Sequence, residues 1–300
     1  MKSKLRLFFT VTFCSFFFIS VNAQNGIVVL QTDFGLKDGA VAAMKGVAMQ
    51  VDNHLQVFDL THEIPAYNIW EAAFRLNQVA AYWPRGTVFV SVVDPGVGSE
   101  RKSIVLQTNS GHFFVSPDNG SLTLVAERLG IKAVREIDEK KNRLPGSDSS
   151  YTFHGRDVFA YTAARLASKK ITFKQVGKLM PAKVQLLPYQ KPVLENGTIK
   201  GTITVLDVQY GNVWSNIDAS LLQQAGISLN DTVLVTIYYK QSPVYYGTMT
   251  FVHTFSDVPE QQPLGYLNSE LKFSVALNMG SFAAKHKIES GPDWMIEVSK

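Results

Sequence analysis

The sequence predicts an α/β domain with a mostly parallel sheet, followed by an all-β domain that resembles a barrel. Strand-like and helix-like segments alternate in the first half, three prolines interrupt the pattern at 176–192, and short strand-like runs fill the rest. Such alternation predicts a parallel sheet covered on both faces, whereas short, closely spaced strands predict a barrel or sandwich. We therefore expect domains at 24–190 and 191–300. The runs that predict strands in the second domain are 202–209, 212–217, 232–239, 244–255, 264–268 and 271–278.

The segments of the first domain follow from the spacing of their apolar residues. Residues 38–51 are expected to form a helix, with Asp38 as a favourable N-cap residue. Residues 68–83 have helical apolar spacing, and the helix at 121–130 ends at Gly130, a common stop signal. The remaining predicted elements are strands at 26–34, 55–61, 86–94, 102–108 and 112–116, and a helix at 155–167.

The first 23 residues predict a secretory signal peptide. Three basic side chains within the first six residues precede an apolar stretch at 7–21, and Ala23 offers a small residue at the cleavage position. The alternative is a membrane anchor, but the apolar stretch is shorter than the ~20 residues that a span needs. We expect cleavage after Ala23 and an exported protein, periplasmic or extracellular, without membrane attachment.

Composition excludes several classes of function. The three basic residues of the leader belong to the formal net charge of +4, which leaves +1 on residues 24–300. No long basic run remains, so nucleic-acid binding is unsupported. The single cysteine, Cys14, lies in the leader, which excludes a cysteine nucleophile, thiolate-ligated zinc and iron–sulfur clusters from the rest of the chain. The metalloprotease, hydrolase-elbow and phosphate-loop motifs are also absent. We expect a small-molecule substrate, no metal and no cofactor.

Polar side chains stand where predicted strands and helices of the first domain begin or end. Asp33 follows the first strand, Asp94 ends the third, Arg101 lies beyond a Pro-Gly-Val-Gly turn, and His154 precedes a helix. Ligands of open parallel sheets bind outside the carboxyl ends of the strands. A carboxylate at Asp33 could accept hydrogen bonds from both hydroxyls of a ribose. The structural alternatives are a turn or cap residue for Asp33, an ion bridge between Asp94 and Arg101, and a capping or packed residue for His154.

Two clusters in the second domain combine aromatic and polar side chains. Aromatic faces with a few polar groups suit a purine or a similar flat ligand. Core packing is an adequate alternative for Tyr210 and Trp214. The clusters are Asp207, Tyr210, Asn212 and Trp214 around one glycine turn, and Asn268 and Ser269 after a later apolar run.

Several stretches occur in the order of one known family. They are TDFGLKDGAVAAMKG (32–46), DLTHEIPAYNIWEAA (59–73), FVSVVDPGVGSERKSI (89–104), FVSPDNGSLT (114–123), TFHGRDVFA (152–160), LDVQYGNVWSNI (206–217) and YLNSELKFSVALN (266–278). Together they resemble the S-adenosyl-methionine hydroxide adenosyltransferases, or S-adenosyl-methionine hydrolases, and the related fluorinase and chlorinase. The resemblance implies an α/β domain and a β-barrel, and a homotrimer with the nucleoside held between two subunits. The implied reaction converts S-adenosyl-methionine and water to adenosine, L-methionine and a proton.

The resemblance also implies roles for individual residues. Asp94, Arg101 and His154 match the triad of the hydrolase branch, which holds a water or hydroxide for attack on the 5′ carbon; whether His154 or Asp94 takes the proton stays open. Glu270 departs from the fluorinase, which has an arginine that helps bind methionine. The matching substrate residues are Asp33 for the ribose hydroxyls, Tyr67 for an aromatic wall, Asp207 for the methionine ammonium, Ser269 for the methionine carboxylate, and Tyr210, Asn212 and Asn268 for the nucleoside pocket.

Two other functions remain as alternatives. Halide transfer is disfavoured because Gly155 stands where fluorinases have a serine and Asp94 where they have a tyrosine, and a carboxylate would repel a halide. The second alternative is an exported protein that binds a nucleoside or S-adenosyl-methionine without catalysis. Such a protein would need Asp33 and the barrel residues but neither Arg101 nor His154.

Overall fold

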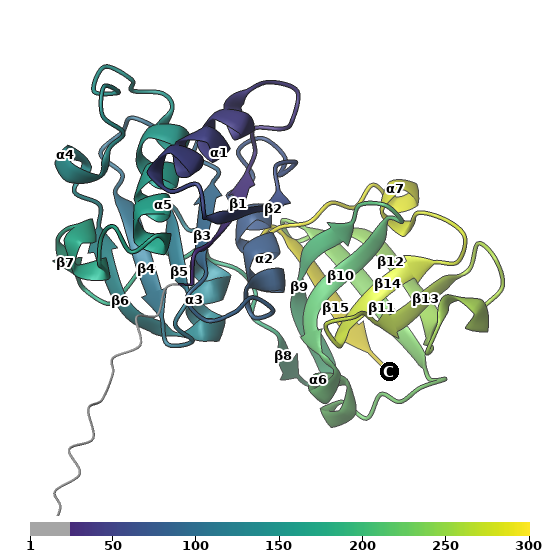
Figure 1. Ribbon diagram of the computed structural model, residues 1–300. Helices are drawn as coiled ribbons and strands as arrows, with labels where there is room; N and C mark the ends of the chain where they lie inside the picture. The colour runs from purple at the N-terminus through teal and green to yellow at the C-terminus, as the bar shows by residue number, and fades with distance from the viewer. Residues whose placement is uncertain (1–24) are drawn as a thin grey trace, which may run out of the picture.

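The computed structural model describes residues 25–300, and these residues form two domains, each built around its own sheet. Figure 1 shows the α/β domain beside the barrel, with helix α2 (Ile69–Ala80) on the side that faces the barrel. The predicted signal peptide at 1–23 lies outside the described residues. Within residues 25–300, no helix is both long enough and apolar enough to cross a membrane.

The sheet of the first domain is parallel where the predicted site lies. Strand β1 pairs in parallel with β2 and β3, and β3 pairs in parallel with β5. Strands β4, β6 and β7 continue the sheet with antiparallel pairings. The strand order is β2 (Gln56–Thr61), β1 (Ile27–Thr32), β3 (Val88–Val92), β5 (Phe113–Pro117), β4 (Ser103–Thr108), β6 (Ile131–Glu136) and β7 (Leu179–Met180).

Helices cover both faces of this sheet because side chains alternate along its strands. Val28 and Leu30 of β1 belong to a core cluster with α1 (Ala40–Val51) and α5 (Tyr161–Ala167), whereas Val29 packs in a second cluster with α2 and α3 (Thr123–Leu129). The other helices of the domain are α4 (Glu139–Asn142), the π-helix Gly155–Ala160 that continues into α5, and the 3-10 helix Phe173–Val176.

The predicted helix starts are close to the observed ones. Helix α1 begins at Ala40, two residues later than expected, and the Asp38 carboxylate accepts a hydrogen bond from the Ala40 amide at 2.9 Å. Helix α2 is capped by Asn68, whose side chain accepts from the Glu71 amide at 2.9 Å. The expected single helix at 155–167 starts as a π-helix and becomes α-helical at Tyr161.

The second domain is a closed seven-strand barrel. The sheet order ends with β9 next to β8, and a further pairing between β9 and β10 closes the ring. The fold class predicted from the sequence is thereby confirmed. The seven barrel strands are β10 (Asn212–Asp218), β14 (Lys272–Leu277), β13 (Pro263–Leu267), β12 (Ser242–Phe251), β11 (Thr232–Tyr239), β15 (Trp294–Ser299) and β9 (Thr198–Asp207). Strand β8 (Val193–Glu195) pairs with β9 outside the ring, and the domain also has helices α6 (Ala219–Gln224), α7 (Phe282–His286) and the 3-10 helix Phe255–Asp257.

Helix α2 joins the two domains through hydrogen bonds to β9. The indole nitrogen of Trp70, which is buried, donates to the Thr204 carbonyl at 2.8 Å, and Arg75 donates to the Leu206 carbonyl at 3.4 Å. Since β9 ends at Asp207, these bonds connect the α/β domain to the strand that carries one of the predicted binding residues.

Candidate active site

A cavity of about 270 Å³ lies at the carboxyl ends of β1 and β3. Its lining includes Asp33, Tyr67, Asp94 and His154. Asp33 directly follows β1, and Asp94 comes two residues after the end of β3. Because β1 and β3 are parallel neighbours, their carboxyl ends meet at one edge of the sheet, and the two carboxylates reach the same cavity.

Asp33 is held by a backbone contact but keeps an oxygen available. Its Oδ2 atom accepts a hydrogen bond from the Tyr67 amide at 2.9 Å. Tyr67 has a left-handed backbone conformation, with φ of 68°, and its side chain is 72% exposed. The contact shows that Asp33 does stabilise a turn, and its place in the cavity also leaves room for a ribose. The two interpretations of Asp33 are therefore compatible.

A hydrogen-bond network next to Asp33, buried at Thr32 and His62 and partly exposed at Asp59 and Lys45, was missed by the sequence analysis. Thr32 Oγ1 lies 2.8 Å from His62 Nδ1, and His62 Nε2 lies 3.0 Å from Asp59 Oδ1. Asp59 also pairs with Lys45 at 2.6 Å. Because the Asp59 carboxylate can only accept, His62 donates from Nε2 and accepts the Thr32 hydroxyl proton at Nδ1, while Thr32 Oγ1 accepts from the Phe34 amide at 3.2 Å. The network fixes the backbone on both sides of Asp33.

Asp94 and Arg101 form a direct ion pair. Arg101 Nη2 donates to Asp94 Oδ2, and the side chains are only 13% and 5% exposed, respectively. Burial raises the pKa of Asp94 above its ordinary value of 3.8, while the charge of Arg101 opposes that rise. Arg101 Nε is buried without a hydrogen-bond partner among the described residues. The ion bridge exists, and it reaches the cavity through Asp94, whereas Arg101 lies behind Asp94 and does not line the cavity.

His154 lines the cavity from the start of the π-helix. Its Nε2 atom lies 3.2 Å from Nη2 of Arg143, a residue that the sequence analysis did not select. Burial lowers the pKa of His154 below its ordinary value of 6.5, so the imidazole is neutral at pH 7. Gly155 follows it, and a Cβ atom there would come within 3.0 Å of the Phe34 ring. The glycine therefore permits close packing of Phe34 beside His154.

A second cavity, of about 760 Å³, lies in the barrel domain. Its lining includes Trp214, for which core packing was the alternative, so this side chain is not confined to the core. Two buried donors, Trp214 Nε1 and Asn268 Nδ2, have no hydrogen-bond partner among the described residues. Buried donors are rarely left unpaired, so this wall suits a ligand with acceptor atoms. The predicted residues that line the cavity are Asp207, Tyr210, Asn212, Asn268 and Ser269.

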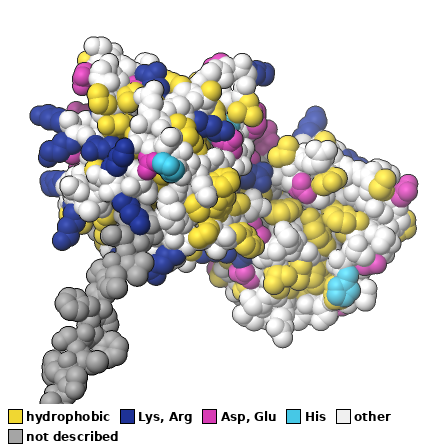
Figure 2. Space-filling model, in the orientation of Figure 1, with side chains coloured by type: hydrophobic (Ala, Val, Ile, Leu, Met, Phe, Trp, Pro, Cys, Tyr) yellow, Lys and Arg dark blue, Asp and Glu magenta, His cyan; other side chains and the backbone are white. Residues whose placement is uncertain are grey.

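Apart from Arg101, which lines neither cavity, the predicted site residues lie in two separate cavities of one chain. Asp33, Asp94 and His154 line the first, whereas Asp207 and Ser269 line the second. Figure 2 shows apolar side chains exposed on both domains, while Lys and Arg gather on the outer side of the α/β domain. Within residues 25–300, no group of three His, Asp or Glu side chains is placed to hold a metal ion.

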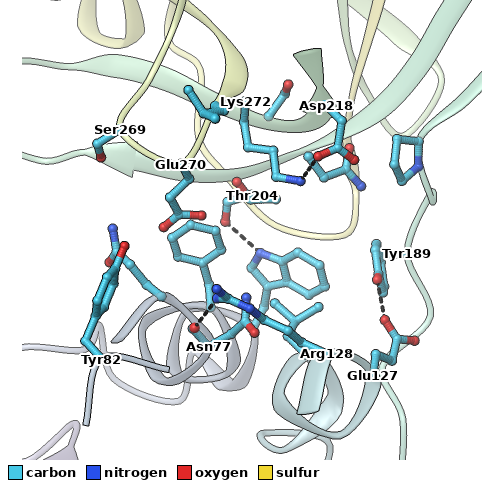
Figure 3. Close-up of a pocket in the computed structure, with 18 residues that line it drawn as sticks. Asn77, Tyr82, Glu127, Arg128, Tyr189, Thr204, Asp218, Ser269, Glu270 and Lys272 are labelled. Carbon is cyan, nitrogen blue, oxygen red and sulfur yellow. Dashed lines mark hydrogen bonds and ion pairs between the residues drawn. The ribbon is translucent and has the colours of Figure 1, made fainter. Parts of the chain in front are cut away.

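Glu270 points away from the second cavity. Its side chain enters a cavity of about 620 Å³ between the domains, which is also lined by Arg128 and Lys272 (Figure 3). Its amide donates to Asn268 Oδ1 at 2.8 Å. Burial raises the pKa of Glu270 above its ordinary value of 4.5. Glu270 thus orients Asn268 through its backbone, and its carboxyl group belongs to the interdomain cavity.

The raised pKa of Glu270 predicts a pH-dependent effect on stability. An acid whose pKa is higher in the folded state binds protons more tightly when folded, so its contribution to stability falls as pH rises above 4.5. Glu270→Gln mimics the neutral form, so we expect it to raise the melting temperature at pH 8 and to leave it unchanged at pH 4. Thermal denaturation of both proteins across this range measures the effect, with exposed Glu260→Gln as the control. A lower melting temperature at pH 8 would mean that ionised Glu270 is stabilising.

Comparisons with known proteins agree over most of the chain. The family model described as the SAM hydroxide adenosyltransferase N-terminal domain matches residues 28–177, and the C-terminal domain model matches residues 201–295. A protein named (R)-S-adenosyl-L-methionine hydrolase from Methanocaldococcus jannaschii is 36% identical over 218 residues, which are 71% of this chain and 74% of that relative. A protein of the same name from Salinispora tropica is 37% identical over 254 residues, 84% and 90% of the two chains. The crystal structure of an uncharacterized conserved protein from Thermotoga maritima has a TM-score of 0.81 and 31% identity, and the match covers 91% of this chain and 100% of that one.

Proposed function

This chain belongs to the S-adenosyl-methionine hydroxide adenosyltransferase family and hydrolyses S-adenosyl-methionine to adenosine and methionine; we propose that a water held by Asp94, Arg101 and His154 attacks the 5′ carbon. The observation that carries this mechanism is the ion pair of Asp94 and Arg101 beside a cavity that His154 and Asp33 also line. These groups come from loops at one edge of the sheet, where a nucleoside would present its ribose.

The chemistry needs little besides a positioned nucleophile. The water oxygen forms a bond to the 5′ carbon, the bond between that carbon and sulfur breaks, and its electron pair stays on the sulfur of methionine. The water loses one proton, so adenosine, methionine and a proton account for all atoms. Because the sulfonium is already a good leaving group, the site must orient water and remove competing solvent. Arg101 can stabilise hydroxide character on the attacking oxygen.

Reaction in isotopically labelled water tests the position of attack. With ¹⁸O-water, we expect one labelled oxygen in adenosine and none in methionine, as measured by mass spectrometry of the separated products. Adding fluoride or chloride should leave adenosine as the nucleoside product, because a carboxylate at Asp94 disfavours a halide. Unlabelled adenosine, or a halogenated nucleoside, would contradict the proposed attack by water.

We further propose that the working site lies between two subunits of a homotrimer. Within one chain, the predicted residues that line a cavity are divided between two separate cavities. Each cavity also has an exposed aromatic side chain: Tyr67 is 72% exposed and Tyr210 is 66% exposed. A neighbouring subunit would cover both and would bring the cavity around Asp94 next to the one around Asp207. Repeated head-to-tail contacts of this kind close into a ring.

Mixing two inactive variants tests the shared site. Asp94→Ala damages only the first cavity and Asp207→Ala only the second, so each trimer made of one variant should be inactive. Co-expression should restore activity to about one quarter of the wild-type value. With random assembly, each of the two cavities that make up a site is intact in about half of the cases, so both are intact in about one quarter of the sites. Sedimentation analysis should give a trimer. Co-expressed variants that assemble but stay inactive would place the whole site within one subunit.

We also propose that the protein is exported, on the basis of the charged and apolar start of the sequence. The expected N-terminus of the mature protein is Gln24, and the protein should be found in the periplasm or outside the cell. Mass spectrometry of the N-terminal peptide from fractionated native cells measures both. Retention of Met1 in the membrane fraction would support the anchor instead.

A further inference from the structure

We propose that Arg143 is a positioning residue that fixes the ring proton of His154 on Nδ1, so that His154 donates a hydrogen bond to the attacking oxygen and is not its base. This inference rests on the proposed role of His154 in holding water. It concerns a contact between Arg143 Nη2 and His154 Nε2 at 3.2 Å.

The contact determines the tautomer because arginine has no hydrogen-bond acceptor. Arg143 must donate, so His154 Nε2 must accept with its lone pair, and a neutral ring then carries its proton on Nδ1. Nδ1 has no hydrogen-bond partner within residues 25–300 in the structure, and His154 lines the first cavity. The ring therefore offers an N–H group to a bound water, while its only lone pair is occupied.

The guanidinium is held in place from three sides. Nη2 of Arg143 also contacts Glu139 Oε2 at 2.5 Å, and Nη1 donates to the Ser150 carbonyl at 3.1 Å. Its side chain is 13% exposed. The loop is already anchored by the bond from Arg143 to the Ser150 carbonyl and by a backbone hydrogen bond from the Leu144 amide to the Asp157 carbonyl at 2.8 Å. The third contact joins the guanidinium to the imidazole of the first cavity.

Burial keeps the ring neutral, because it lowers the pKa of His154 more than the surrounding charges raise it. The charged groups that act on His154 are Glu139, Arg143, Asp94 and Arg101, and Arg143 opposes a positive imidazole while Glu139 favours it. With the His154 lone pair occupied and Asp33 assigned to the ribose hydroxyls, Asp94 is the carboxylate of the cavity that remains to accept the proton of water. A carboxylate has enough lone pairs to do so while it holds Arg101. His154 and Asp94 thereby have different roles, donor and acceptor.

Nuclear magnetic resonance of the ring nitrogens tests the tautomer without relying on activity. The mature protein is labelled with ¹⁵N-histidine, and the signals of His154 are identified by their loss in His154→Gln. We expect the Nδ1–H form in the wild type at pH 7.5. In Arg143→Met, the Nε2–H form should appear and the pKa of His154 should rise, because the attraction of Glu139 remains. Arg143→Lys keeps a donor and should retain the Nδ1–H form.

Arg165→Met is the matched control. Arg165 supports the same segment, through bonds to the Lys141 carbonyl at 2.6 Å and Asn142 Oδ1 at 2.8 Å, but does not contact His154. It should leave the tautomer unchanged. Arg143→Met should lower kcat roughly 10- to 100-fold with little change in KM, the size seen for groups that orient metal-bound histidines, and Arg143→Lys should recover part of the loss.

The proposal is overturned if wild-type His154 carries its proton on Nε2, or if Arg143→Met leaves the Nδ1–H form unchanged. The wild-type spectrum decides the tautomer even if Arg143→Met does not fold. Failure of the proposed function would be seen in a different measurement. Wild-type turnover in His154→Gln would exclude His154 from catalysis, and the nitrogen spectrum would still report whether Arg143 fixes the tautomer.

Discussion

Arg101→Met and His154→Gln should each lower the rate of S-adenosyl-methionine hydrolysis by about 100- to 1000-fold while adenosine still binds. The expected loss is that of removing one preorganised donor from a reacting oxygen, about 2.7–4 kcal/mol. Asp94→Asn should have a similar effect because it removes the partner of Arg101 and the proposed proton acceptor. The measurement is single-turnover release of adenosine, with adenosine affinity from calorimetry.

The three groups should also act as a unit. If they hold one water, the double variant of Arg101 and His154 should be little slower than the slower single variant. Lys102→Met is the control, since Lys102 is adjacent to Arg101 but forms a surface pair with Glu136 at 3.0 Å. Circular dichroism checks that each variant is folded. Wild-type rates for both Arg101→Met and His154→Gln would exclude these residues from catalysis.

The pH profile should follow from the same groups. The pKa of His154 lies below 6.5, so a neutral ring is present throughout the physiological range. Turnover should therefore be constant above pH 6.5 and fall at lower pH, where protonation of His154 breaks its contact with Arg143 and protonation of Asp94 removes the acceptor.

Asp33→Asn should weaken adenosine binding by about one to two orders of magnitude. The carboxylate accepts one bond from the Tyr67 amide and has capacity for two ribose hydroxyls. Losing a hydrogen bond to a charged group costs about 1.5–3 kcal/mol, which corresponds to roughly 10- to 100-fold in affinity. Since the ribose hydroxyls do not react, turnover of bound substrate should change less than affinity.

Calorimetry with adenosine and with 2′-deoxyadenosine makes this test specific. The wild type should bind adenosine more tightly than the deoxynucleoside, and Asp33→Asn should reduce that difference. Asp38→Asn is the control, because Asp38 is exposed and only accepts from the Ala40 amide. Equal adenosine affinity for wild type and Asp33→Asn would leave Asp33 with its turn contact alone.

The sequence by itself determined the class of each domain and most of its strands and helices. Val28, Val29 and Leu30 are apolar in succession, and a strand buried on both faces requires such a run. Helical spacing at 68–83 is an equally local signal, because it depends on residues three or four positions apart. The placement of Asp33 and Asp94 at strand ends was also local, and the parallel order of β1 and β3 then brought them together.

Only the tertiary structure decided which distant groups meet. Strands β6, β7, β8 and β15 were not predicted, although β15 lies between β9 and β11 and completes the barrel. Arg143 lies in a loop without apolar periodicity, so nothing in its neighbourhood indicated a contact with His154. The direction of Glu270, toward the interdomain cavity, depends on how α2 packs against β9. The division of the predicted residues between two cavities has the same cause: spacing along a chain fixes neither the pairing of remote strands nor the orientation of loop side chains.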